Sequence, residues 1–137
     1  MVARVEMTAG YSGTPLWKKL GFKPGMKVCA LDPPPHYVDL LADGPNDWIM
    51  VPAPKSCDAI HLFIIEPKDV KEIVTLSQHL PPAFMLWISW PKKSSPLSRG
   101  LSEDYIRKAA LACGLVDIKV CAVDADWSGL KLTRRKV

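Results

Sequence analysis

The segment from Cys57 to Ile65 constrains the fold of this chain most, because it is apolar along nearly its whole length. A strand with one face in water alternates apolar and polar residues, whereas a strand covered on both faces does not. Two further runs, Met26–Leu31 and Phe84–Trp90, have the same character. Strands of this kind occur in parallel sheets with helices on both faces, so the chain is predicted to build such a sheet.

Helices are predicted between these strands. Residues 67–80 repeat apolar side chains on one helical face, and Ser102 can cap a later helix that ends at Gly114. Shorter helices are expected over residues 15–21 and 36–42, and a weaker strand over Trp48–Val51.

The C-terminal part of the chain predicts a hairpin. Leu115–Val123 and Leu130–Thr133 are strand-like, and the short turn at residues 124–129 between them requires antiparallel pairing. The full pattern predicts an α/β fold with three layers, in which a mostly parallel sheet ends in a C-terminal antiparallel hairpin. The chain of 137 residues is expected to form a single Rossmann-like domain over residues 1–137, with residues 1–10 as a flexible arm.

Three consecutive prolines, Pro33–Pro35, follow the first buried run and Asp32. In nucleotide-binding α/β domains the corresponding turn is rich in glycine, so that the backbone and its N–H groups can approach the ligand. Proline has no N–H and fixes φ, so three prolines remove three donors and stiffen the turn. The sequence therefore predicts a domain of nucleotide-binding shape with an altered ligand turn.

The composition indicates a cytoplasmic protein. None of the four cysteines belongs to a CxxC pair, so they are expected to be reduced core residues, as in cytosolic proteins. The first ten residues lack an apolar stretch of signal-peptide length, and the longest apolar runs are too short to cross a bilayer, so no membrane partner is expected. A formal net charge of +4 permits an anionic partner but does not require one.

The order of the elements resembles the class I methyltransferase version of the Rossmann-like sheet. Within this resemblance, residues 58–63 correspond to the fourth strand, residues 80–90 to the loop and fifth strand, and residues 115–133 to the closing hairpin. Residues 42–57 are too few for two further strands with their helices. The resemblance therefore implies a sheet that is truncated on one side.

Three blocks of sequence also resemble one family of small bacterial proteins, which is known only as a domain of unknown function. The blocks are Tyr11–Leu16, Trp87–Lys93, and Gly114–Asp117 running on to Trp127–Leu132. The resemblance extends from about Tyr11 to Lys136. It implies the same fold and a bacterial, cytoplasmic origin, but no activity, substrate or catalytic residue.

A ligand site is expected beyond the carboxyl ends of the parallel strands, where open α/β sheets bind their ligands. Asp32 can reach a ligand amino group or cap the following helix, and His36 can act as an acid or base or be an exposed turn residue. Lysines beside an indole suit a small anionic, phosphate-bearing ligand or a nucleic acid, or simply form a solvated loop. The candidate ligand-binding residues at this edge are Asp32, His36, Glu66, Trp90, Lys92, Lys93 and Arg99.

Three other patterns have simpler interpretations. Cys57 and His61 would lie roughly 13 Å apart on a strand, which is too far to share one metal ion, so no metal site is predicted. Asp124 and Asp126 are interpreted as residues of the hairpin turn. The basic tail, residues 131–136, either binds an acidic partner such as nucleic acid or protects an edge strand from aggregation.

These observations leave three hypotheses for function. The first is a non-enzymatic or regulatory binding module without a predicted cofactor, indicated by the proline turn and by the segment missing after Val51. The second is an S-adenosylmethionine-dependent methyltransferase with an atypical cofactor loop, in which side chains such as Asp32 replace the absent N–H groups. The third is a nucleic-acid-binding protein that uses Lys92, Lys93 and the basic tail.

Overall fold

The computed structural model describes residues 14–42, 44, 48–51, 57–80 and 84–135, so the expected arm over residues 1–10 lies outside the described residues. The elements are α1 (Leu16–Leu20), β1 (Lys27–Leu31), α2 (Tyr37–Leu40), β2 (Ile49–Met50), β3 (Ala59–Phe63), η3 (Pro67–Val70), α3 (Lys71–Ser77), β4 (Met85–Pro91), α4 (Glu103–Ala112), β5 (Leu115–Ala122) and β6 (Trp127–Arg134).

Within this described part, the strands form one six-stranded sheet in the order β2-β1-β3-β4-β6-β5. The strands β2, β1, β3 and β4 are parallel, and β6 runs antiparallel to both β4 and β5. The predicted α/β fold, with a mostly parallel sheet and a C-terminal antiparallel hairpin, is therefore confirmed. The two-residue strand β2 ends the sheet on one side, as the expected truncation requires.

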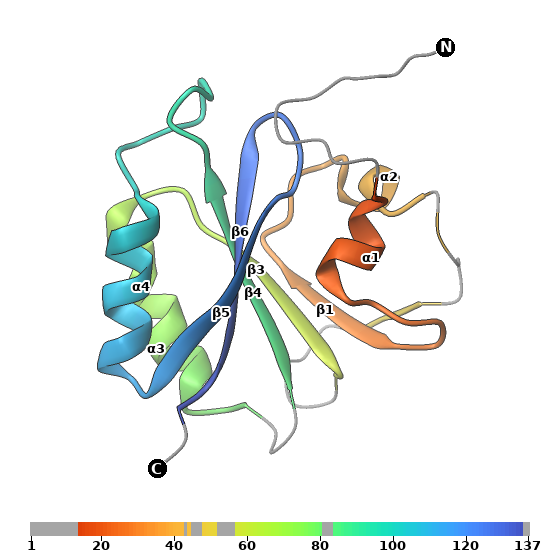
Figure 1. Ribbon diagram of the computed structural model, residues 1–137, viewed down its shortest axis with the longest axis horizontal. Coiled ribbons are helices and arrows are strands. Elements are labelled where there is room, and N and C mark those ends of the chain that lie inside the picture. Colours follow the sequence, from red (N-terminus) through yellow and green to blue (C-terminus); the bar gives the residue numbers. More distant parts are fainter. Residues whose placement is uncertain (1–13, 43, 45–47, 52–56, 81–83, 136–137) are drawn as a thin grey trace.

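Helices cover both faces of the sheet, with α3 and α4 on one side and α1 and α2 on the other (Figure 1). Because side chains alternate along a strand, the central strands contribute to two separate cores. In β4, Ile88 and Trp90 belong to the core under α3 and α4, whereas Trp87 belongs to the core under α1 and α2. The strand β3 is buried on both faces, as its apolar sequence predicts.

The predicted ends of the helices are largely confirmed. The Ser102 hydroxyl accepts a hydrogen bond from the Tyr105 N–H at 3.2 Å, which caps α4. Gly114 and Gly21 have φ values of +86° and +81°, the left-handed conformation with which glycine ends a helix. The helix expected over residues 67–80 differs, because its first turn is the 3₁₀ helix η3 and α3 ends at Ser77.

The C-terminal hairpin differs from the prediction in two ways. The last strand begins at Trp127 rather than Leu130, because residues 127–129 pair with β4 and residues 128–129 also pair with β5. In addition, β6 lies inside the sheet and β5 forms its edge, so charges on β6 do not protect an edge strand. In the part of the chain that the structure describes, no helix has the length and apolar character needed to cross a membrane.

Candidate functional site

The proline turn reverses the chain at the carboxyl end of β1. Asp32 has a φ of +53°, and it is the one described residue other than glycine with a positive φ. Proline cannot adopt this conformation, whereas aspartate tolerates it, so the reversal falls on the residue before the prolines. The N-cap of α2 is His36, without a side-chain hydrogen bond, so the interpretation of Asp32 as a helix cap is wrong.

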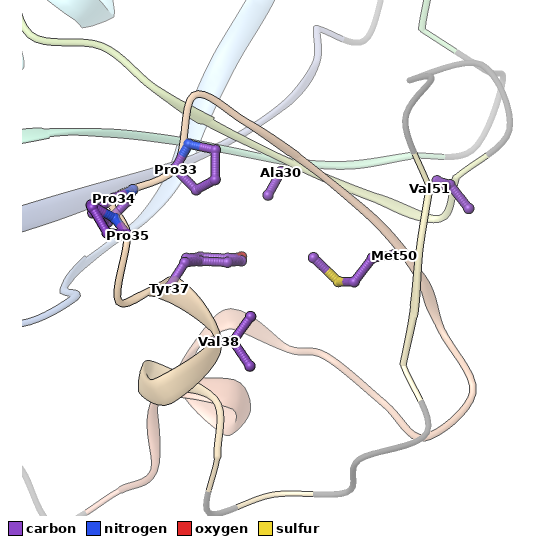
Figure 2. A pocket seen from close by; sticks show the side chains of 8 residues that line it. All are labelled: Ala30, Pro33, Pro34, Pro35, Tyr37, Val38, Met50 and Val51. Carbon is purple, nitrogen blue, oxygen red and sulfur yellow. The ribbon is translucent and has the colours of Figure 1, made fainter.

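A pocket of about 520 Å³ lies between the proline turn, α2 and β2, at the carboxyl edge of the sheet. Figure 2 shows the ring of Tyr37 between the three prolines and the side chain of Met50. The lining side chains are all apolar except for the Tyr37 hydroxyl, and none is charged; they belong to Ala30, Pro33, Pro34, Pro35, Tyr37, Val38, Met50 and Val51. We call this site the apolar pocket.

The Tyr37 hydroxyl is engaged by a buried chain of polar side chains. It lies 2.9 Å from Nδ1 of His61, and Nε2 of His61 lies 2.7 Å from the Ser89 hydroxyl. His61 and Ser89 are fully buried, and Tyr37 is 3% exposed. Burial lowers the pKa of His61 to about 3, so the imidazole is neutral. One ring nitrogen therefore donates a hydrogen bond and the other accepts one.

This chain of polar groups was not among the predicted site residues. The sequence pattern raises His61 only through its spacing from Cys57, which excludes a shared metal ion, and it does not mark Ser89 or Tyr37 as site residues. The signal available in the sequence is a polar residue inside each of two apolar strands, His61 in β3 and Ser89 in β4. Their pairing with Tyr37 requires the parallel register of the two strands and the position of α2.

A second pocket, of about 390 Å³, lies at the same edge between β1, β3 and the following segments. Its lining contains four carboxylates and one guanidinium, together with two apolar side chains; the residues are Asp32, Phe63, Ile65, Glu66, Asp69, Glu72 and Arg99. We call this site the acidic pocket. Three predicted site residues, Asp32, Glu66 and Arg99, are thus brought together as expected for the carboxyl edge.

The acidic pocket has an excess of negative charge, and Lys92 and Lys93, on which the prediction of an anionic ligand rests, do not line it. Burial raises the pKa of Glu72, and Asp32 and Asp69 add to this effect. The pKa of Asp69 is lowered, chiefly because the Glu66 N–H donates to its carboxylate. Arg99 donates to the carbonyl oxygens of Pro96 and Ser98, at 3.3 and 3.0 Å. An excess of carboxylates favours a cationic group, such as an amine, over a phosphate.

The two pockets are adjacent at the carboxyl edge of the sheet. The rings of Tyr37 and Phe63 meet edge to face, with centroids 5.4 Å apart, and Tyr37 lines the apolar pocket whereas Phe63 lines the acidic pocket. Phe63 also stacks on His61 at 4.2 Å. A ligand that moved either ring would therefore change the wall of the other pocket.

The remaining predicted site residues lie outside both pockets. The indole of Trp90 is 5% exposed and packs in the core under α3 and α4, so the expected pairing of lysines with an accessible indole is not formed. Lys93 is exposed and Lys92 is partly exposed after β4. The His36 Nε2 lies 2.9 Å from the carboxylate of Asp124, which connects the proline turn to the hairpin turn.

The predicted basic loop and basic tail do not form one surface. The register of β4 and β6 pairs Pro91 with Trp127 and Leu86 with Leu132, so the tail ends at the edge opposite to Lys92. The guanidinium of Arg134 lies 5.4 Å from the centre of the Phe84 ring, and Arg135 donates to the Leu111 carbonyl. Lys136 lies outside the described residues.

Solved structures of methyltransferases share this fold. The chain is similar to an S-adenosylmethionine-dependent methyltransferase from Aquifex aeolicus, with 17% identity and a TM-score of 0.57 over 85% of this chain and 86% of that one. It is also similar to a protein of the NADB-Rossmann superfamily from Streptococcus agalactiae, with 13% identity and a TM-score of 0.51 over 96% of this chain and 72% of that one.

A third similar structure is an O-methyltransferase of neocarzinostatin biosynthesis, solved with S-adenosylmethionine and a naphthoic acid. The identity is 11% and the TM-score 0.58, and the likeness covers 92% of this chain but 51% of that one. These likenesses define the class of the chain as a small methyltransferase-like Rossmann fold, and at such identities they show the fold alone. No protein-family model and no curated protein matches the chain.

Proposed function

We propose that the chain is a non-catalytic binding module, which takes a small, uncharged and largely apolar ligand in the apolar pocket. The observation that carries this proposal is the lining of the pocket, which holds no charged side chain. The pocket lies where open α/β sheets bind their ligands, and its volume of about 520 Å³ is in the range of small-molecule sites.

The same lining disfavours a nucleotide-like cofactor. Pro33–Pro35 offer no N–H groups, and the Tyr37 hydroxyl is already paired with His61. Dinucleotide-binding folds place a carboxylate after the second strand to bind a ribose hydroxyl, whereas Val51 stands there in this chain. A charged cofactor would be desolvated by the apolar lining without gaining a polar partner there, which is unfavourable. An apolar ligand that buries about 150 Å² of surface would gain roughly 4 kcal/mol of binding free energy.

A fluorescent apolar probe tests the proposal directly. Nile red, which is uncharged, is expected to bind the wild-type protein with increased emission. Val38→Glu places a carboxylate on the pocket wall at a side chain that is 71% exposed, so the fold should tolerate it. The apparent Kd for the probe should rise at least about fivefold, because the carboxylate resists desolvation.

The matched control is Val74→Glu, the same substitution at an exposed position of α3 on the opposite side of the sheet. This variant is expected to bind Nile red like the wild type. Equal loss in both variants, or no loss in Val38→Glu, would contradict the proposal.

A methyltransferase that uses S-adenosylmethionine is the second candidate. The fold supports it, and the carboxylates of the acidic pocket, including Asp32, would suit the cationic groups of this cofactor. Calorimetric titration with S-adenosylmethionine separates the two candidates. Under our proposal no appreciable heat is released, whereas micromolar binding that Asp32→Asn weakens would establish the second candidate in its place.

We also propose that the protein is bacterial and cytoplasmic. The three sequence blocks around Tyr11–Leu16, Trp87–Lys93 and Trp127–Leu132 support membership of the bacterial family of unknown function. A cytoplasmic location follows from the same resemblance and from the isolated cysteines. A role without catalysis would agree with a chain that keeps the methyltransferase sheet but has lost its glycine-rich turn.

A further inference from the structure

Three lysines from separate elements converge at the C-terminal end of α1. The Nζ of Lys19, in α1, donates to the Ala122 carbonyl at 3.0 Å, and the Nζ of Lys119, in β5, donates to the Lys19 carbonyl at 3.1 Å. The Nζ of Lys131, in β6, lies 3.8 Å from the position that a Cβ would take on Gly21. We call Lys19, Lys119 and Lys131 the lysine cluster.

The lysine cluster brings like charges together without compensation. Lys119 and Lys131 are direct partners across the antiparallel strands β5 and β6, and like charges in this position are destabilising. The pKa of Lys131 is lowered by burial and further by Lys119. Among the described residues, the ion pairs involve other side chains, and none includes a member of the cluster.

Part of the cluster has a structural explanation. Cations at the C-terminal end of a helix bind its free carbonyl groups and interact favourably with its dipole, which accounts for Lys19 and Lys119. The side chain of Lys131 makes no hydrogen bond to another described residue. Conflicts with local physical rules concentrate at functional sites in proteins, so the pairing of Lys131 with Lys119 marks a candidate site for an anionic ligand.

The members of the cluster in β5 and β6 lie on the face of the sheet that α1 covers, with Lys119 exposed and Lys131 partly exposed. The neighbours of Lys131 in β6, Leu130 and Leu132, face the core under α3 and α4, so Lys131 and its partner Lys119 lie on the opposite face. On that face α1 packs on Trp87, whose indole donates to the Leu20 carbonyl at 2.8 Å, and the end of α1 reaches β5, where Lys119 donates to the Lys19 carbonyl. The ammonium group of Lys119 is therefore beside α1 on an exposed strand at the sheet edge.

We propose that the lysine cluster binds the phosphate backbone of a nucleic acid. Ammonium groups that repel each other in the free protein are neutralised by a chain of phosphates, and this relief adds to the counterions that binding releases. An anionic membrane fits less well, because membrane-surface sites combine cations with exposed apolar side chains. The exposed Val120 of β5 pairs with Leu130 and so lies on the other face. The proposal does not depend on the apolar pocket.

Fluorescence anisotropy with a labelled single-stranded DNA of about 20 nucleotides tests the proposal, with salt varied from about 50 to about 200 mM. The wild type is expected to bind at low salt and to weaken as salt is added. The double variant Lys119→Gln/Lys131→Gln should raise the Kd about tenfold at low salt and should reduce the slope of log K against log salt by about 1.4.

The matched control is Lys68→Gln/Lys71→Gln, which removes the same charge from exposed residues of η3 and α3. It should change the Kd less than about twofold, because these lysines lie away from the cluster. Lys131→Gln alone removes the repulsion without removing a side-chain hydrogen bond, so it should raise the Tm or leave it unchanged and still weaken binding severalfold.

Five results would overturn the proposal. Four of them are equal losses in the control and the double variant, full binding by the double variant, loss confined to Lys92→Gln/Lys93→Gln, and no binding of the wild type at low salt. Binding to vesicles of anionic phospholipid without binding to DNA would also reject it. A failure here leaves the Nile red result unaffected, so the two proposals stand or fall separately.

Discussion

Removal of the Tyr37 hydroxyl is expected to destabilise the fold by about 1–3 kcal/mol. The hydroxyl lies 2.9 Å from Nδ1 of His61, and this histidine is fully buried. Tyr37→Phe keeps the ring and its edge-to-face contact with Phe63, but it leaves a buried nitrogen without a partner. The loss is the cost of keeping that nitrogen away from water, which is larger than the net worth of an ordinary hydrogen bond.

The measurement is the free energy of unfolding from urea titration, followed by tryptophan fluorescence. Tyr105→Phe is the matched control, because Tyr105 is 48% exposed on α4 and the same hydroxyl is removed there. The control should change the stability by less than about 0.5 kcal/mol. Equal effects of the two substitutions would refute the reasoning, since they would show that His61 does not depend on Tyr37.

A triple variant tests whether the buried polar side chains of Tyr37, His61 and Ser89 act as a unit. Tyr37→Phe/His61→Phe/Ser89→Ala removes every polar group of the chain, so no buried donor or acceptor is left unpaired. Its destabilisation should be smaller than the sum of the three single losses, by about 0.5–3 kcal/mol. Additive losses would mean that the three side chains act independently.

Three further predictions concern other parts of the molecule. Folding lowers the pKa of His61 from 6.5 to about 3, so the unfolded chain binds the proton more tightly; stability from this group is complete above pH 6.5 and is lost as the pH falls toward 3. The loss should reach about 2 kcal/mol at pH 5. Urea titrations at pH 8 and pH 5 give the free energy of unfolding at each pH, and it should fall more between these pH values for the wild type than for His61→Gln. Gly129→Ala should cost about 1–3 kcal/mol by urea titration, because its Cβ would lie 3.2 Å from Cε3 of Trp87 and Cγ2 of Val123; an unchanged Tm would show that these neighbours yield freely. Ser102→Ala removes the cap of α4 and should cost about 1 kcal/mol by the same titration, whereas Ser102→Asp should preserve stability.

The buried polar contacts of Tyr37, His61 and Ser89 link the stability of the core to the shape of the apolar pocket. Tyr37 contributes its ring to the apolar pocket and its hydroxyl to His61, so the stability of the core and the shape of the pocket depend on one side chain. A ligand that fits the pocket is therefore expected to raise the Tm of the wild type more than that of Tyr37→Phe, because the ring of the variant is no longer held by a hydrogen bond.

Much of the fold was predictable because it depends on short-range patterns. The apolar run at residues 57–65 has the composition of a strand covered on both faces, and β3 lies at the centre of the sheet. Capping by Ser102 and helix termination at Gly114 act within a few residues, so local sequence determines them. The start of β6 at Trp127 was missed, because pairing with β4 and β5 is a long-range effect.

The topology of the sheet allowed the location of the site to be predicted, but not which side chains line it. Parallel strands place their carboxyl ends at one edge, which brings Asp32, Glu66 and Arg99 to one pocket. Strand parity decides what a residue faces, and it directs Trp90 into the core rather than toward Lys92. The acidic character of the pocket comes from Asp69 and Glu72 in the following helices, which no strand pattern marks.

The sequence by itself determined the kind of protein: apolar runs require a sheet covered on both faces, and the prolines after Asp32 exclude an N–H-rich ligand turn. Only the tertiary structure decided which side chains meet. The contact between Tyr37, His61 and Ser89 and the opposition of Lys119 and Lys131 join residues of different elements. The physical reason is that strand register and helix placement are set by packing over the whole core, so polar contacts between distant residues follow from the assembled fold.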